Sequence, residues 1–158
     1  MKITTSGDFA ATPEQLFAVL SDQSYQDGAA AQPGASSRVE THGDRTVVTT
    51  VRILPTDRLP EFAKTFVGSH VNLTETQDWG PAAADGSRQG SLTLTIDGAP
   101  LSLTGEILLA PTASGSRQSV DADLRARIPL VGGRVEQAAA PAVKDAIEYE
   151  FNRLRKAL

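Results

Sequence analysis

The chain has 158 residues and a net charge of −4, with acidic and basic residues interspersed along its length. A chain of this length can bury the core of one domain, so we expect a single domain over residues 1–158. The charge excludes the basic footprint of a nucleic-acid-binding protein, and the lack of cysteine excludes a disulfide framework and a thiolate nucleophile.

Location is predicted from the same features. The first residues lack the apolar core of a signal peptide, and no segment approaches the about 18 apolar residues of a membrane span. A chain without cysteine also suits a reducing compartment. We therefore expect a cytoplasmic protein that is not integral to a membrane.

The amino-terminal part predicts a strand followed by two short helices. Residues 2–9 alternate apolar and polar side chains, as a strand does. Thr12 and Gln15 have the spacing of a capping box, which marks the start of the first helix. Asp22 can cap the second helix, and the Gln-Pro-Gly turn at residues 32–34 ends it.

From residue 36 onward the apolar residues recur with a period of two, interrupted at turn residues. The predicted strands cover residues 38–41, 46–54, 70–79, 91–96, 101–109 and 120–128. Short connections rich in Gly, Asp and Ser join most of them, which predicts an antiparallel meander. In the last strand Val120 and Leu124 share one face, opposite Asp121 and Arg125, so one face of the sheet needs a cover.

Residues 59–68 interrupt the strands with a short apolar segment. Pro60 suits the first position of a helix, Phe62 and Phe66 lie at helical spacing, and Gly68 can end the turn. Two interpretations stay open, a flap that gates a cavity or a plug that packs on the core.

The carboxyl-terminal residues 133–158 form the one long helical pattern. At about 100° per residue, Val143, Ile147, Phe151 and Leu154 fall on one side of this helix, and charged residues fall on the other. A helix of this length spans roughly 39 Å at about 1.5 Å per residue, enough to cross a whole sheet. We expect it to cover the apolar face.

This order of elements resembles the START-like superfamily, also called SRPBCC. The segment Ala11–Asp22 (ATPEQLFAVLSD) is similar to the superfamily's first-helix signature, and Ile128–Glu136 (IPLVGGRVE) resembles its junction into the last helix. Leu59–Lys64 and Thr76–Trp79 look like passages in a bacterial subfamily of unassigned function. The resemblance covers nearly the whole chain.

The resemblance implies an α+β helix-grip fold, in which a curved antiparallel sheet wraps around the long C-terminal helix and two short helices follow the first strand. It also implies a cavity between sheet and helix. It does not select a function, because members bind very different ligands and only some are enzymes.

Polar residues on the apolar face are the informative ones in such a cavity. Glu75, Gln77 and Trp79 share one face of their strand, and Glu150 lies within about 40° of the centre of the helix's apolar stripe. In one interpretation Glu75, Gln77 and Glu150 orient an apolar ligand. In the other they are exposed, with Glu150 and Arg153 as a surface ion pair. Trp79 belongs either to the cavity rim or to the core.

The candidate ligand-binding residues are the side chains expected to face this cavity: Val51, Ile53, Phe62, Phe66, Leu73, Glu75, Gln77, Trp79, Leu94, Ile107, Leu124, Val143, Ile147, Glu150, Phe151 and Leu154. We expect no metal and no cofactor, because His42 and His70 are the only histidines and neither belongs to a ligand spacing.

The first hypothesis is a binding protein that takes an apolar small molecule or lipid into the cavity, with residues 59–68 as its gate. One alternative is an enzyme of the polyketide cyclase/dehydratase type, in which Glu75 or Glu150 acts as a general acid or base at a raised pKa. Another is an interaction module whose interior is filled with side chains. A cavity of roughly 300 to 1,000 Å³ supports a ligand, and close packing to the centre favours the interaction module.

Overall fold

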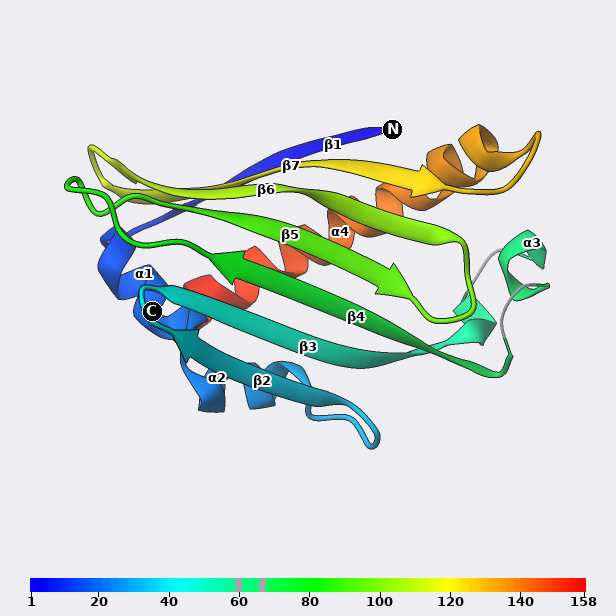
Figure 1. The fold of residues 1–158 in the computed structure, drawn as a ribbon, viewed down its shortest axis with the longest axis horizontal. Helices are drawn as coiled ribbons and strands as arrows, with labels where there is room; N and C mark the ends of the chain where they lie inside the picture. Colours follow the sequence, from blue (N-terminus) through cyan, green and yellow to red (C-terminus); the bar gives the residue numbers. More distant parts are fainter. Residues whose placement is uncertain (59–60, 66–67) are drawn as a thin grey trace.

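The computed structural model describes residues 1–58, 61–65 and 68–158, without the side chains of residues 58, 62 and 63. A seven-stranded antiparallel sheet, in the order β1-β7-β6-β5-β4-β3-β2, forms one layer (Figure 1). Its strands are β1 (Lys2–Phe9), β2 (Ser36–His42), β3 (Arg45–Pro55), β4 (His70–Trp79), β5 (Arg88–Ile96), β6 (Leu101–Thr112) and β7 (Gly115–Ala126). The predicted meander is confirmed, and β1 joins it by pairing with β7.

The observed β7 begins before the predicted strand does, and it also ends before it. The strand begins at Gly115 because both β1 and β6 continue to pair with it as far as Ser116. It ends at Ala126, whose backbone N–H donates to the Glu136 carboxylate at 2.9 Å instead of to a neighbouring strand. Ile128, predicted as the last strand residue, therefore lies in the connection to the final helix.

Four α-helices accompany the sheet in the described residues, α1 (Pro13–Leu20), α2 (Gln23–Ala29), α3 (Glu61–Lys64) and α4 (Gly132–Ala157), together with the short 3-10 helix η1 (Thr56–Arg58). The predicted capping box of α1 is present, since the Gln15 N–H donates to Thr12 Oγ1 at 3.2 Å and the Thr12 N–H donates to Gln15 Oε1 at 2.9 Å. Asp22 caps α2 by accepting from the Tyr25 N–H at 2.8 Å. Both helix starts are thus stabilised locally, as their sequences indicate.

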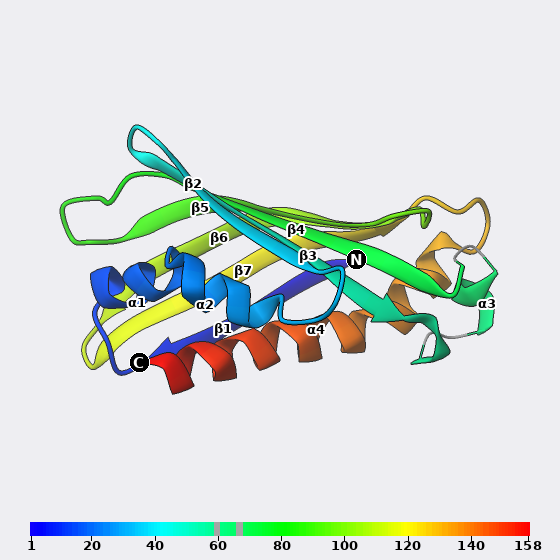
Figure 2. The ribbon, with the colours of Figure 1, turned by 90° about the horizontal axis from the view of Figure 1, so that it is seen from below.

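Helices α1, α2 and α4 cover one face of the sheet, and α4 runs beneath it as the expected long element (Figure 2). The helix packs against β7, β1 and α1. It lies close to β1 at Gly7, where a Cβ would come within 2.8 Å of the Phe151 ring. Phe151 in turn meets Phe9 edge to face, with ring centroids 5.9 Å apart. The helix is therefore anchored at the β1 edge of the sheet.

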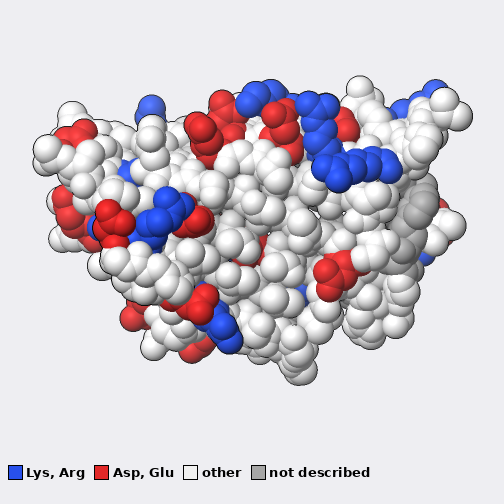
Figure 3. All heavy atoms as spheres, in the orientation of Figure 1, with Lys and Arg blue, Asp and Glu red and all other residues white. Residues whose placement is uncertain are grey.

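The two faces of the sheet differ as the alternation predicts. Val120, Ala122 and Leu124 are buried beneath the helices, and Asp121 and Arg125 are exposed on the other face. Figure 3 shows this outer face, where acidic and basic side chains mix along the edge formed by β1 and β7. The apolar face is consequently the one on which to look for a site.

Candidate functional site

A cavity of about 520 Å³ lies between α4 and the inner faces of β3 to β7, with α1 and α2 closing one side. This volume falls within the range of roughly 300 to 1,000 Å³ that ligand pockets occupy. It exists because α4 contacts the β1 and β7 side of the sheet closely and the opposite side much less. The interior is therefore not filled with side chains.

Most of the predicted site residues line this cavity. They are Leu73, Glu75, Gln77, Leu94, Ile107, Leu124, Val143, Ile147, Glu150, Phe151 and Leu154. Ala138, Ala142 and Ala146 also line it, and these three alanines remain exposed although they lie on the cavity side of α4. Their small side chains leave both the free volume and a route to solvent along this flank of the helix.

The prediction was wrong for Val51 and Ile53, which do not line the cavity. Residues paired directly across an antiparallel ladder point to the same face. Arg52 pairs with the inward-facing Leu73, so Arg52 points inward and its neighbours point away. Ile53 instead packs against the loop at Gly34, where no Cβ would fit.

Trp79 faces inward but belongs to the core and does not line the cavity. It is fully buried and meets Phe17 edge to face, with ring centroids 5.9 Å apart. The large ring fills the space beneath α1, so it closes this end of the interior. Of the two interpretations of Trp79, the structure supports the core.

The predicted gate falls largely outside the described residues. Leu59, Pro60, Phe66 and Val67 lie outside them altogether, and Phe62 is described only by its backbone, within α3. The ligand-binding role of Phe62 and Phe66 therefore stays a prediction. Figure 1 places α3 at the end of the molecule where α4 begins.

A charged cluster lies in the mainly apolar wall and is centred on Arg52. Its Nη2 is 2.9 Å from Glu150 Oε1 and 3.8 Å from Glu75 Oε2. The other oxygen of Glu150 accepts from Arg153 Nη1 at 2.8 Å. Two guanidinium groups thus face two carboxylates, and the charges of the cluster balance.

Burial raises the pKa of Glu150 because its charged form loses hydration. Arg52 and Arg153 oppose this shift, and the neighbouring Glu75 carboxylate reinforces it. The Glu150 side chain is 24% exposed, so it is neither the free surface residue of one interpretation nor fully enclosed. It is a cavity residue held between two arginines.

Glu75 belongs to a chain of hydrogen bonds along the inner face of β4. Gln77 Nε2 donates to Glu75 Oε1 at 2.6 Å, and Trp79 Nε1 donates to Gln77 Oε1 at 3.0 Å. These bonds hold both side chains in place without a ligand. The predicted inward placement of Glu75 and Gln77 is confirmed.

Two buried polar atoms in the cavity wall have no hydrogen-bond partner in the part of the chain that the structure describes, Tyr25 Oη and Gln118 Oε1. A buried polar group left unpaired costs about 1–3 kcal/mol. Burial also raises the pKa of Tyr25 to about 12, so its hydroxyl stays a donor at neutral pH. Both residues line the cavity, and these two atoms are themselves buried.

Sequence reasoning missed Arg52, Tyr25 and Gln118. Arg52 lies in a strand with apolar residues on both faces, so the alternation could not show which face points inward. Tyr25 lies on a helix whose orientation depends on its packing. Gln118 precedes the predicted start of the last strand, although its position two residues before Val120 places it on the same face.

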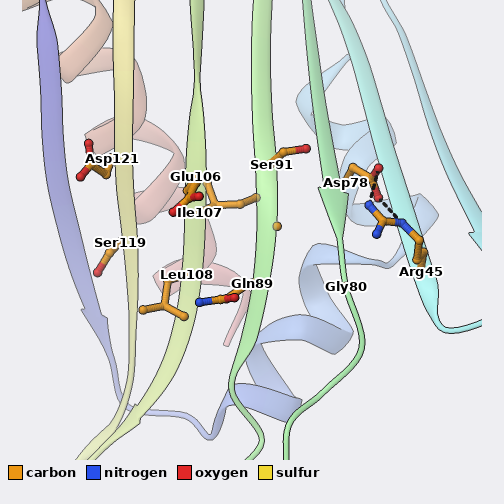
Figure 4. Close-up of a pocket in the computed structure, with 11 residues that line it drawn as sticks. Arg45, Asp78, Gly80, Gln89, Ser91, Glu106, Ile107, Leu108, Ser119 and Asp121 are labelled. Atoms are coloured by element: carbon orange, nitrogen blue, oxygen red, sulfur yellow. Dashed lines mark hydrogen bonds and ion pairs between the residues drawn. The ribbon is translucent and has the colours of Figure 1, made fainter.

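A second hollow, of about 450 Å³, lies on the outer face of the sheet (Figure 4). The Arg45–Asp78 ion pair, at 2.7 Å, borders one side, and Glu106 and Asp121 face each other on β6 and β7 at the other. Gly80 and Gly90 are among the residues that line it. It contains no buried unpartnered polar atom among the described residues, so the inner cavity is the better candidate.

No group of three His, Asp or Glu side chains within the described ranges has the arrangement of a metal site. Within the same ranges, no helix is both long enough and apolar enough to cross a membrane.

The curved sheet, the long C-terminal helix and the cavity between them define a START-like fold. The fold matches the crystal structure of TTHA0849 from Thermus thermophilus with a TM-score of 0.63 and 15% identity, covering 99% of this chain and 95% of that one. A START superfamily protein from Mycobacterium smegmatis matches with a TM-score of 0.58 and 13% identity, covering 99% of both chains. A STAR-related lipid transfer protein from Xanthomonas axonopodis matches with a TM-score of 0.61 and 14% identity, covering 99% of this chain and 84% of that one.

Residues 4–158 match the family model described as "Protein of unknown function (DUF2505)", and the chain belongs to this family. Two curated relatives, Rv0481c of Mycobacterium tuberculosis and Mb0491c of Mycobacterium bovis, are each 25% identical over 105 residues. That stretch is 65% of this chain and 60% of either relative. The expected START-like fold and the expected family of unassigned function are thereby confirmed.

Proposed function

We propose that the protein binds a neutral, mainly apolar small molecule or lipid in the cavity between α4 and the sheet. The single observation that carries this proposal is the 520 Å³ cavity with an apolar wall interrupted by one charge-balanced cluster. The names of two structural neighbours, a START superfamily protein and a STAR-related lipid transfer protein, support it at the level of the fold.

The composition of the wall indicates what the ligand looks like. Leucine, isoleucine, valine and alanine side chains offer no hydrogen bonds, so they favour an alkyl or ring skeleton. The cluster around Arg52 places guanidinium N–H groups beside the cavity. These groups can donate to a carbonyl, ester or hydroxyl oxygen at one end of the ligand.

Charge balance favours a neutral ligand over a fatty acid. Arg52 and Arg153 already compensate Glu75 and Glu150, so a ligand carboxylate would add an uncompensated negative charge in a poorly hydrated site. A neutral oxygen needs no such compensation. We therefore expect an alcohol, a ketone or an ester to bind more tightly than the matching carboxylate.

The interaction module with a filled interior does not fit a cavity of this size. The enzyme keeps one supporting observation, since Glu75 and Glu150 approach the same guanidinium and the pKa of Glu150 is raised. Both carboxylates are nevertheless ion-paired with arginine. Binding without chemistry is the simpler function, and the cytoplasmic location remains part of this proposal.

A substitution on α4 that fills the cavity tests this proposal. In Ala142→Trp a large side chain takes the place of one that lines the cavity, and we expect it to weaken binding of the neutral fluorescent probe N-phenyl-1-naphthylamine at least tenfold. Ala157→Trp makes the same change at the exposed end of the helix and should bind as the wild type does. Equal binding by both variants would reject the cavity as the site.

Displacement of that probe tests the charge argument separately. We expect 1-dodecanol to displace it at lower concentration than dodecanoate does at pH 7. If dodecanoate were the better competitor, the cavity would still bind apolar molecules, and the assignment of a neutral polar end would be wrong.

A further inference from the structure

The connection between β7 and α4 contains a leucine in a strained turn. The Val131 N–H donates to the Pro129 carbonyl at 2.9 Å, and Leu130, between them, has a φ of 68°. A γ-turn with positive φ is rare and strained. Glycine would adopt this conformation without the steric cost that a leucine side chain brings.

The start of α4 also lacks the usual stabilising features. Val131 occupies the N-cap position without a side-chain hydrogen bond, and the first turn has no acidic residue. Arg134, near this end, has the charge that a helix N-terminus disfavours. The helices α1 and α2 of the same chain begin with the capping residues Thr12 and Asp22. The residues at the start of α4 are therefore not the ones that stabilise a helix N-terminus in this chain.

Apolar side chains nevertheless project from this connection into solvent. Leu130 is 104% exposed, the highest value among the exposed large apolar residues in the described part of the chain, and Val131 is 41% exposed. Arg127 and Arg134 flank them, are themselves exposed and have no ion pair with any described residue. Leu130 and Val131 thus form an exposed apolar tip, which Arg127 and Arg134 flank with positive charge.

The tip lies at the end of the molecule where α3 is found and where α4 begins, as both views of the ribbon show (Figures 1 and 2). Ile128 and Val135, just before and after the tip, line the cavity. The lining there is apolar, with Ala99, Pro100 and Ala138 nearby in the wall. The tip therefore adjoins the apolar part of the cavity.

We infer that residues 127–134 form a docking surface for an anionic lipid bilayer. Leu130 and Val131 enter the boundary between headgroups and acyl chains, and Arg127 and Arg134 approach the lipid phosphates. A protein interface of ordinary stability buries about 800 Å² per partner, which a tip of two apolar residues does not supply. The inference does not depend on which molecule occupies the cavity.

Vesicle co-sedimentation of the full chain tests this surface. At low salt, wild-type protein should sediment with vesicles of phosphatidylcholine and phosphatidylglycerol and much less with phosphatidylcholine alone. Leu130→Gly should lower partitioning about tenfold or more, because it removes the inserting side chain. Leu130→Met keeps an apolar side chain and should keep binding. Arg127→Gln combined with Arg134→Gln should weaken binding at low salt and reduce its salt dependence.

Thermal melts exclude a merely structural effect. Leu130→Gly should melt no lower than wild type, since glycine relieves the positive φ at this position. Leu158→Ser, which removes another exposed leucine at the opposite end of α4, should leave vesicle binding unchanged. The inference is overturned if wild type binds no anionic vesicles or if Leu130→Gly binds them equally well. It is also overturned if the tip instead mediates a concentration-dependent dimer that Leu130→Gly abolishes.

Discussion

Glu150 illustrates how burial and ion pairing compete at a single residue. Desolvation raises its pKa above the ordinary value of 4.5, although Arg52 and Arg153 both pull it down. The folded protein therefore holds a proton on Glu150 at a pH where the unfolded chain has released it. Stability contributed by this group is present below pH 4.5 and is lost as the pH rises toward the raised folded pKa.

We expect Glu150→Gln to fold and to reduce the decrease in stability between pH 4.5 and 7, because glutamine keeps the shape of the protonated acid and does not titrate. Urea unfolding at a series of pH values measures this slope. Asp145→Asn makes the matching change on the exposed face of the same helix and provides the control. A steeper slope in Glu150→Gln would mean that the ion pairs outweigh desolvation.

Arg52 is a single residue whose orientation could not be predicted from the sequence. Its charge argues for an exposed position, because arginine is rarely buried. Pairing with Leu73 instead turns it into the cavity, where two carboxylates compensate it. Nothing local in β3 distinguishes these outcomes.

At the scale of elements, α4 has a packed half and an open half. Phe151 and Leu154, toward its end, also line the cavity, but each is 2% exposed and belongs to the core cluster with Phe9. Val143 and Ile147 are only partly buried, because they face the cavity. The apolar stripe was predicted as one continuous surface, yet its two halves are buried to different extents.

This division predicts different effects of two truncations. Phe151→Ala should destabilise the fold by about 3–5 kcal/mol, the usual cost of removing a buried aromatic ring. Ile147→Ala should cost about 1 kcal/mol, since less of its surface is buried, and should weaken probe binding more than Phe151→Ala does among the folded molecules. Urea unfolding measures the loss of stability, and probe titration measures binding. Equal destabilisation by both variants would contradict the difference between the two halves of α4.

At the scale of the whole molecule, the cavity makes stability depend on ligand. A ligand that binds the folded state alone stabilises it by about 2.7 kcal/mol at a concentration of 100 Kd. We expect 1-dodecanol to raise the urea midpoint of wild type with an unchanged m-value and to leave Ala142→Trp nearly unaffected. An equal increase in both would place the ligand outside the cavity.

Local patterns alone predicted the elements, their order and the apolar face of the sheet. The capping box at Thr12, the alternation in β7 and the stripe on α4 each arise from interactions between residues close in the chain, so they can be recognised without a structure. The START-like resemblance added the way these elements pack, and the comparisons bear it out.

Tertiary structure decided the site. The inward face of β3 depends on its register with β4, and the cavity depends on how far α4 stands from the sheet once Gly7 and Phe151 have fixed its contact with β1. The register and the cavity both depend on how segments far apart in the chain pack together. Periodicity records which side of an element is apolar, but it carries no measure of the space between two such sides.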